Sequence, residues 1–276
     1  MRGVVSAGMV SALEELGLAR AFDAVYGSSA GAINGAYFLA GQATLGATIY
    51  YDDINTREFI DLWRPLRGRP ILDLEFFIDD VAVKRKTLDT ARLLSSPTPL
   101  VVLATDVETA DAAAFRTFEN GADLLHAMRA GSTMPVVAGG PYTYRGRRYL
   151  DASLSQAVPL AAAEADRHTH ILVLLTRPCG ETRRLSAFDR YYVMPRLRRL
   201  SPTLAQRYHD RVEQYTALMA RIDSTRTDGT GPAIIGIRPR ASSIGRLERR
   251  RSILVAAADE GRRVVIDAFR DALSDR

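Results

Sequence analysis

The sequence predicts an α/β fold in which helices cover both faces of a mostly parallel central sheet. Short apolar runs typical of buried strands lie at 22–26, 99–106 and 171–176. Segments with helical apolar spacing separate these runs, and no internal repeat or clear linker divides the chain. Because strands that alternate with helices favour a parallel sheet, we expect a single domain over residues 1–276.

Composition agrees with a large globular domain. The 276 residues are 47% hydrophobic and 25% charged, which is enough to bury a sizeable core. The single cysteine, Cys179, excludes an internal disulfide and a cysteine metal cluster, and it fits a cytoplasmic location. No apolar run approaches the length needed to span a bilayer.

In the first third of the chain, a helix is predicted over 4–16, where apolar residues recur at the spacing of an amphipathic helix. A strand over 22–26 and a helix over 32–40 follow, and Gly41 suits the end of that helix. Residues 45–95 are predicted to be mainly helical, with breaks at Pro65 and Pro70. We interpret the apolar residues of this region as core, and a cap or acyl-pocket lining is the alternative: Ile60, Leu62, Trp63, Ile71, Leu72, Phe76 and Phe77.

The remaining elements continue the alternation of strands and helices. A buried strand over 99–106 is followed by the other predicted elements in this order: a strand over 113–118, a helix over 122–130, a strand over 147–150, a helix over 159–167, a central strand over 171–176, arginine-rich helices, an apolar run over 233–237 and a helix over 252–273.

The segment Gly27-Ser28-Ser29-Ala30-Gly31 has the pattern G-x-S-x-G between a predicted strand and a predicted helix, as in a nucleophile elbow. The two glycines leave room for a tight turn and for close helix packing. Such a turn exposes the Ser29 hydroxyl at a helix N-terminus, where backbone N–H groups favour negative charge. The pattern predicts Ser29 as the nucleophile of an acyl transfer, with a small-residue packing turn as the alternative. We interpret Ser28 as turn filler.

A serine nucleophile needs a base, and no histidine is placed as a triad base. Two histidines precede the strand at 171–176, opposite its active end, and two lie in helical segments: His168, His170, His126 and His209. Asp151 follows the strand at 147–150, at the edge where the chemistry is expected. Because burial raises the basicity of a carboxylate, Asp151 can accept the serine proton. A turn or helix-cap role is the alternative.

The combination of these motifs resembles the patatin-like phospholipase family. The resemblance covers about residues 1–180 and leaves an arginine-rich helical portion over about 181–276. It is carried by residues 2–10, 27–31, 129–135 and 149–160. It implies a three-layer α/β/α sandwich, a dyad of Ser29 and Asp151, and lipid acyl hydrolysis that requires no metal or cofactor.

Two positions depart from the family pattern. The family has a glycine-rich loop after its first strand whose N–H groups form the oxyanion hole, and Met1-Arg2-Gly3 matches only the end of that loop. The resemblance assigns what remains of the hole to Arg2, Gly3 and Ala30. The first strand and most of the loop are missing, so we expect the true start to lie upstream. Ala152 stands where the family has glycine, and alanine resists a positive φ.

The sequence therefore predicts a serine hydrolase acting on phospholipid or lysophospholipid esters through an acyl-enzyme. A lipid-binding or regulatory protein, disabled by the incomplete loop, is the alternative. A transacylase or thioesterase with the same dyad is another. A nucleotide-binding function is disfavoured because neither a G-x-G-x-x-G segment nor a P-loop is present.

The chain carries a net charge of +5, and only Lys84 and Lys86 among its 37 basic residues are lysines. The arginine clusters lie in the C-terminal half. We interpret them as solvated helix faces, and attraction to anionic headgroups at a membrane surface is the alternative. We expect no nucleic-acid partner because no recognition motif accompanies the charge.

Overall fold

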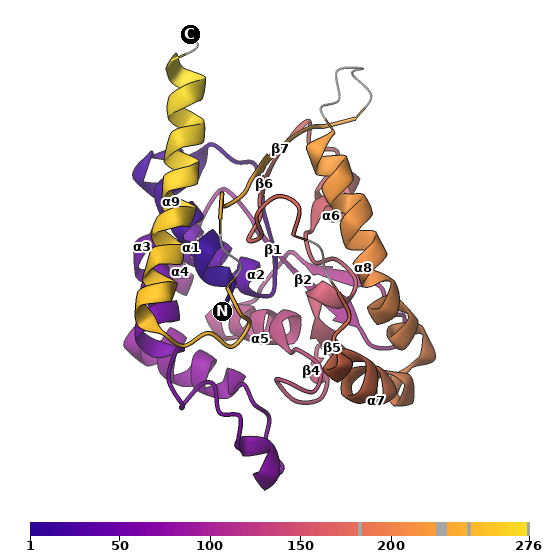
Figure 1. Ribbon diagram of the computed structural model, residues 1–276. Helices are drawn as coiled ribbons and strands as arrows, with labels where there is room; N and C mark the ends of the chain where they lie inside the picture. Colours follow the sequence, from indigo (N-terminus) through magenta and orange to yellow (C-terminus); the bar gives the residue numbers. More distant parts are fainter. Residues whose placement is uncertain (182–183, 225–230, 242–243, 275–276) are drawn as a thin grey trace.

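The computed structural model describes residues 1–181, 184–224, 231–241 and 244–274, and Figure 1 shows its helices packed around strands. The helices are α1 (Gly3–Glu15), α2 (Ala30–Leu39), α3 (Ala43–Thr48), α4 (Thr90–Leu94), α5 (Gly121–Ser132), α6 (Leu160–Ala165), α7 (Met194–Leu200), α8 (Pro202–Asp223) and α9 (Arg251–Ser274). The strands are β1 (Val25–Ser28), β2 (Leu100–Asp106), β3 (Ala112–Phe115), β4 (Tyr142–Tyr144), β5 (Arg147–Asp151), β6 (His170–Leu174) and β7 (Ala233–Ile237). Short 3₁₀ or π segments are η1 (Leu18–Arg20), η2 (Ile49–Asp53), η3 (Arg64–Arg67), η4 (Phe76–Arg85), η5 (Ala152–Leu154) and η6 (Asp189–Val193).

The predicted α/β class is confirmed, but the main sheet is mixed rather than mostly parallel. Its strand order is β1-β2-β5-β4, and β3 pairs with β2 as well. β1 is parallel to β2, whereas the β2–β3, β2–β5 and β4–β5 pairs are antiparallel. The turns that join β2 to β3 and β4 to β5 are only a few residues long, and a parallel pair needs a much longer crossover.

The strand predicted at 171–176 does not join this sheet in the described part of the chain. β6 instead pairs in parallel with β7, as a separate two-stranded sheet. On the β1 side, the only partner among the described strands is β2. One edge of β1 and one edge of β6 are therefore unpaired.

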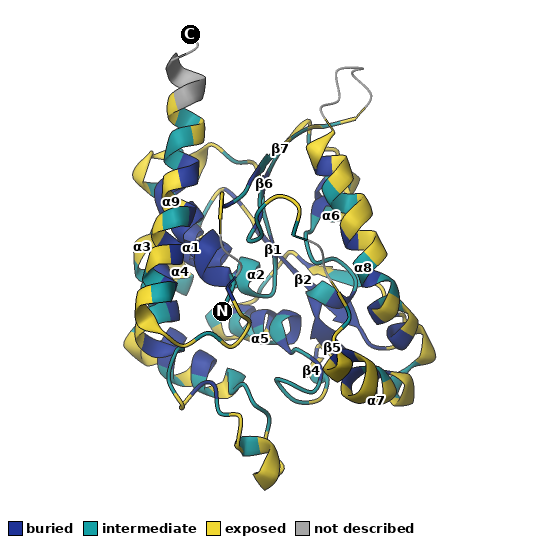
Figure 2. Ribbon diagram, in the orientation of Figure 1, coloured by how far each residue is buried: buried dark blue, intermediate teal, exposed yellow. Residues whose placement is uncertain are grey.

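The helix predicted over 4–16 forms as α1, but it is not amphipathic. Residues 3–13 are all buried, and Figure 2 shows α1 in the buried colour, between α9 and the remainder of the fold. Small residues allow this burial. A Cβ on Gly8 would lie 1.9 Å from the carbonyl oxygen of Ala258, and one on Gly261 would lie 2.1 Å from that of Val5. α1 and α9 are thus in backbone contact at two glycines.

β2 lies at the centre of the main sheet, with every one of its residues buried. Strands β1 and β5 pair with it on opposite sides, and the candidate site described below lies near its carboxyl end. Among the helices of the described residues, none is both long and apolar enough to cross a bilayer.

We predict that Gly261→Ala destabilises the protein. Alanine ordinarily stabilises a helix by up to about 1 kcal/mol relative to glycine. Here its methyl group would meet the Val5 carbonyl, so we expect a net loss of about 1–3 kcal/mol in the free energy of unfolding, measured by urea denaturation. The matched control is Gly140→Ala, because a Cβ there meets nothing within 4 Å. Equal stability of the two variants would contradict the contact.

Candidate active site

Ser29 lies in a sharp turn between β1 and α2. Its backbone has φ 53° and ψ −123°, a conformation that L-residues rarely adopt and that stores strain. Gly27 makes the turn possible, since a Cβ there would lie 2.2 Å from the Cα of Ala32. A Cβ on Gly31 meets nothing within 4 Å, so the expected close helix packing applies to Gly27 and not to Gly31. Gly31 instead lines a cavity.

Ser28 is more than turn filler. Its hydroxyl donates a hydrogen bond of 2.7 Å to the carbonyl oxygen of Gln156. This bond connects the end of β1 to the segment that follows Asp151. The two candidate catalytic segments are therefore joined directly, by a residue whose role the sequence pattern did not indicate.

Asp151 ends β5, and its side chain is almost fully buried, with the residue 1% exposed. Its carboxylate oxygen Oδ1 accepts the N–H of Ser153 at 2.8 Å. Its main chain is held by the Thr133 carbonyl, which accepts the Asp151 N–H at 2.9 Å, and by the Thr105 hydroxyl, which donates to the Asp151 carbonyl at 2.9 Å. Within the described residues, Oδ2 has no hydrogen-bond partner although it is buried. The carboxylate is thus held in place through Oδ1, while Oδ2 is free to accept a proton.

Strand register brings Ser29 and Asp151 to the same level of the sheet. Ser28 is opposite Leu103 on one side of β2, and Asp151 is opposite Ala104 on the other. Ser29, the next residue, is therefore level with Asp151 across β2. Neighbouring strands lie about 4.8 Å apart, so two spacings separate their Cα atoms by about 10 Å. Among the described residues no hydrogen bond joins the Ser29 hydroxyl to the Asp151 carboxylate.

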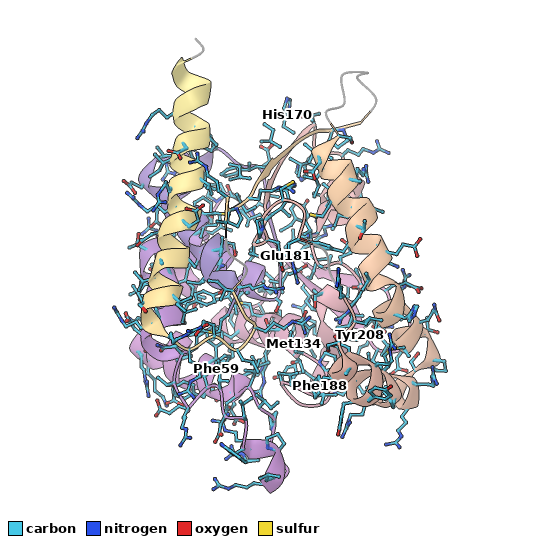
Figure 3. All side chains as sticks on the ribbon, in the orientation of Figure 1. Phe59, Met134, His170, Glu181, Phe188 and Tyr208 are labelled. Atoms are coloured by element: carbon cyan, nitrogen blue, oxygen red, sulfur yellow. The ribbon has the colours of Figure 1, made fainter. Side chains whose placement is uncertain are left out.

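Both residues line one cavity of about 1140 Å³. Much of its wall is apolar and includes Phe59, Met134 and Phe188, which Figure 3 labels in the lower half of the molecule. The acyl-pocket interpretation therefore fits some of the apolar residues of 45–95. Those that line the cavity are Leu62, Ile71, Leu72 and Phe77. Ile60 is buried in the core, and Trp63 is in neither place because it is exposed.

The cavity wall also carries four arginines, Arg2, Arg177, Arg211 and Arg246, and the acid Asp189. Arg2 and Arg177 pair with Glu181, and Arg211 pairs with Asp189. Arg2 lies 3.4 Å from Glu181, and Arg211 lies 3.2 Å from Asp189. Burial lowers the pKa of Arg211, and burial together with the neighbouring Arg177 lowers the pKa of Arg2. An excess of partly desolvated positive charge favours an anionic group in this part of the cavity.

Gly3 lies against Ala30 at the N-terminus of α2. A Cβ on Gly3 would be 2.5 Å from the Cβ of Ala30. A buried amide fixes this contact, since Asn34 Nδ2 donates to the Gly3 carbonyl at 2.8 Å and Asn34 Oδ1 accepts from the Tyr50 hydroxyl at 2.9 Å. The structure therefore brings two of the three predicted oxyanion residues together. The guanidinium of Arg2 bonds the Ile244 carbonyl at 2.8 Å instead.

The histidines do not bond the candidate pair in the described residues. His168 bonds the Tyr26 hydroxyl at 2.8 Å, near the start of β1, and His126 bonds the Tyr142 hydroxyl at 2.6 Å. Ala152 lies in the right-handed 3₁₀ segment η5 and has no positive φ, so the expected conflict with glycine does not arise. No three His, Cys, Asp or Glu side chains are grouped as metal ligands in the described part of the chain.

Comparison with known proteins gives two matches. A model of the patatin-like phospholipase family matches residues 1–164. A protein of Escherichia coli K12, known as uncharacterized protein YjjU, is 29% identical over 181 residues, which cover 64% of this chain and 49% of that protein. The chain thus spans about half the length of this relative.

We predict opposite outcomes for alanine at the two glycines of the turn. Gly27→Ala places a methyl group against the Ala32 backbone, so we expect about 1–3 kcal/mol of destabilisation in urea unfolding. Gly31→Ala enters open space within a helix, so the free energy of unfolding should stay unchanged or rise slightly. The site geometry is contradicted if Gly31→Ala is the more damaging change.

Proposed function

Because the chain belongs to the patatin-like phospholipase family, a family of lipid hydrolases, we propose that it cleaves lipid esters with Ser29 as nucleophile and Asp151 as base. One observation carries the proposal. The strained serine and the buried carboxylate with one free oxygen lie level with each other on either side of β2 and line a single cavity. Strain and unsatisfied polar groups of this kind cluster at functional sites.

The proposed reaction has two steps. The Ser29 Oγ attacks the ester carbonyl carbon while Asp151 takes the hydroxyl proton. The C–O bond to the alcohol then breaks, and the alcohol leaves with that proton. In the second step, Asp151 takes a proton from water, the hydroxide oxygen attacks the acyl carbon, and the free acid departs as the proton returns to Ser29.

The developing oxyanion needs N–H donors near the elbow. In this proposal the backbone N–H of Ala30, at the N-terminus of α2, is one donor. Gly3 lies close enough to Ala30 to supply a second. Arg2 is the third residue assigned to the hole, and its donor would be the backbone N–H, because its guanidinium bonds Ile244 and lies near Glu181.

For the substrate, we propose a phospholipid or lysophospholipid ester. The apolar wall formed by residues such as Ile71 and Phe77 suits an acyl chain. The arginines of the same cavity suit a phosphate, which guanidinium groups bind in bidentate fashion. Arg246 has no acidic partner among the described residues, so a phosphate would supply its counter-charge.

A lipid-binding or regulatory protein is the second candidate. The observation that favours it is the small number of N–H donors that this proposal can assign near the elbow, which among the described residues are those of Arg2, Gly3 and Ala30. Each missing donor lowers the rate by about 10²–10³-fold. Comparison of this chain with one extended upstream decides between the two candidates.

We predict that Ser29→Ala and Asp151→Asn each lower kcat/KM for a short p-nitrophenyl ester by at least about 10³-fold, because each removes one half of the dyad. The matched control is Ser95→Ala, which removes an exposed serine hydroxyl away from the cavity lining and should retain activity within about twofold. Full activity in Ser29→Ala would overturn the proposal. Inactivity of folded protein in both chain lengths would favour the regulatory candidate.

A further inference from the structure

Residues 61–70 form a projection beside the cavity, here named the tip. Figure 1 shows it, around η3, extending from the lower end of the molecule. Its base is fixed to the body. The Asp61 N–H bonds the Ile71 carbonyl at 3.0 Å, the Leu72 N–H bonds the Val137 carbonyl at 2.9 Å, and Ile60 and Leu72 form an antiparallel bridge.

Arg64 holds the tip from within. Its guanidinium donates to the carbonyl oxygens of Phe59 at 3.3 Å and Arg57 at 3.2 Å, and lies 3.6 Å from the Asp73 carboxylate. The Trp63 N–H bonds the Asp61 side chain at 2.9 Å. These bonds fix the conformation of the tip, so the exposure of its apolar side chains is built into the fold.

Three large apolar side chains of the tip face solvent. Leu62 is 62% exposed, Trp63 is 65% exposed and Leu66 is 81% exposed. A cluster of this kind on a rigid projection indicates an interaction surface. Tryptophan is enriched at boundaries between an apolar phase and water, such as the interface of a lipid bilayer.

The charge beside these side chains is positive. Arg67 and Arg69 are exposed on the same short segment. The acids nearby have partners within the protein: Asp61 accepts the Trp63 N–H, and Asp73 lies near Arg64 and Arg69. Exposed arginines next to tryptophan and leucine are complementary to anionic headgroups above acyl chains.

We propose that the tip docks the protein on an anionic lipid bilayer, with Trp63 and Leu66 in the interfacial region and Arg67 and Arg69 among the headgroups. Leu62, which is exposed and also lines the cavity, connects the docked surface to the cavity interior. Docking would place the cavity against its lipid source. That consequence rests on the proposed function, whereas binding to the bilayer does not.

The chain provides its own probe, because Trp63 is its single tryptophan. The test is intrinsic fluorescence during titration with vesicles of phosphatidylcholine mixed with phosphatidylglycerol. We expect the emission to shift to shorter wavelength, and to be quenched when the lipid acyl chains carry bromine. Vesicles of phosphatidylcholine alone should give weaker binding.

Variants that retain Trp63 test the remaining contacts. Leu66→Ala, and Arg67→Gln with Arg69→Gln, should each weaken vesicle binding by about tenfold or more. The matched controls lie elsewhere on the surface. Leu94→Ala removes another exposed leucine, and Arg198→Gln with Arg199→Gln removes another exposed arginine pair; both should bind within about twofold of the parent. Thermal unfolding verifies that each variant is folded.

Two outcomes would overturn the proposal. One is an emission spectrum that vesicles leave unchanged. The other is a shift that appears without lipid and grows with protein concentration, which would assign the tip to contact between copies of the chain. Ser29→Ala should bind vesicles as the parent does. A protein that shows the lipid-dependent shift but cleaves no ester in either chain length would refute the proposed function and leave the tip proposal standing.

Discussion

The backbone of Ser29 is the constraint on which the candidate site depends. A residue with φ near +53° costs of order 1–3 kcal/mol, and it persists only where its surroundings leave no alternative. β1 fixes the chain on one side through its parallel pairing with β2, and the buried helix α2 fixes it on the other. Gly27 allows the two to approach, since its position admits no side chain against Ala32. The same turn aims the first N–H groups of α2 into the cavity that contains Asp151.

Local chemistry is what the sequence predicts well. The turn at Ser29 is predicted because strand, glycine turn and helix lie within a short stretch of chain, and the strand that ends at Asp151 is predicted from its own residues. The role of Asp151 rests on the family resemblance as well as on this position. The pairing of strands is harder to predict from the sequence, because β2 pairs with β5, which lies far from it along the chain. The burial of α1 on all sides was also missed. Its apolar spacing fits a surface helix, whereas its glycines and serines fit close contact with α9 and α2.

The contacts of the side chains around the site are equally hard to predict from the sequence. Asn34 and Tyr50 fix Gly3 through a buried hydrogen-bonded pair, and no periodicity marks a buried polar residue. The arginines of the cavity come from segments far apart in the sequence, so their shared location follows only from the fold. Trp63 is expected in the core together with the other apolar residues of 45–95, but it lies at the start of η3, in the projecting segment 61–70, and is exposed.

The contact between α1 and α9 joins two helices that are synthesised at very different times. α1 is made well before its backbone partner at Gly261, because most of the other elements lie between the two along the chain. Synthesis at about 5–20 residues per second leaves α1 without that partner for on the order of ten seconds or more. During that interval Val5 and Met9, which α9 and its neighbours later cover, remain available to chaperones. The region that matches the family model, residues 1–164, therefore relies on a helix outside it to complete its core.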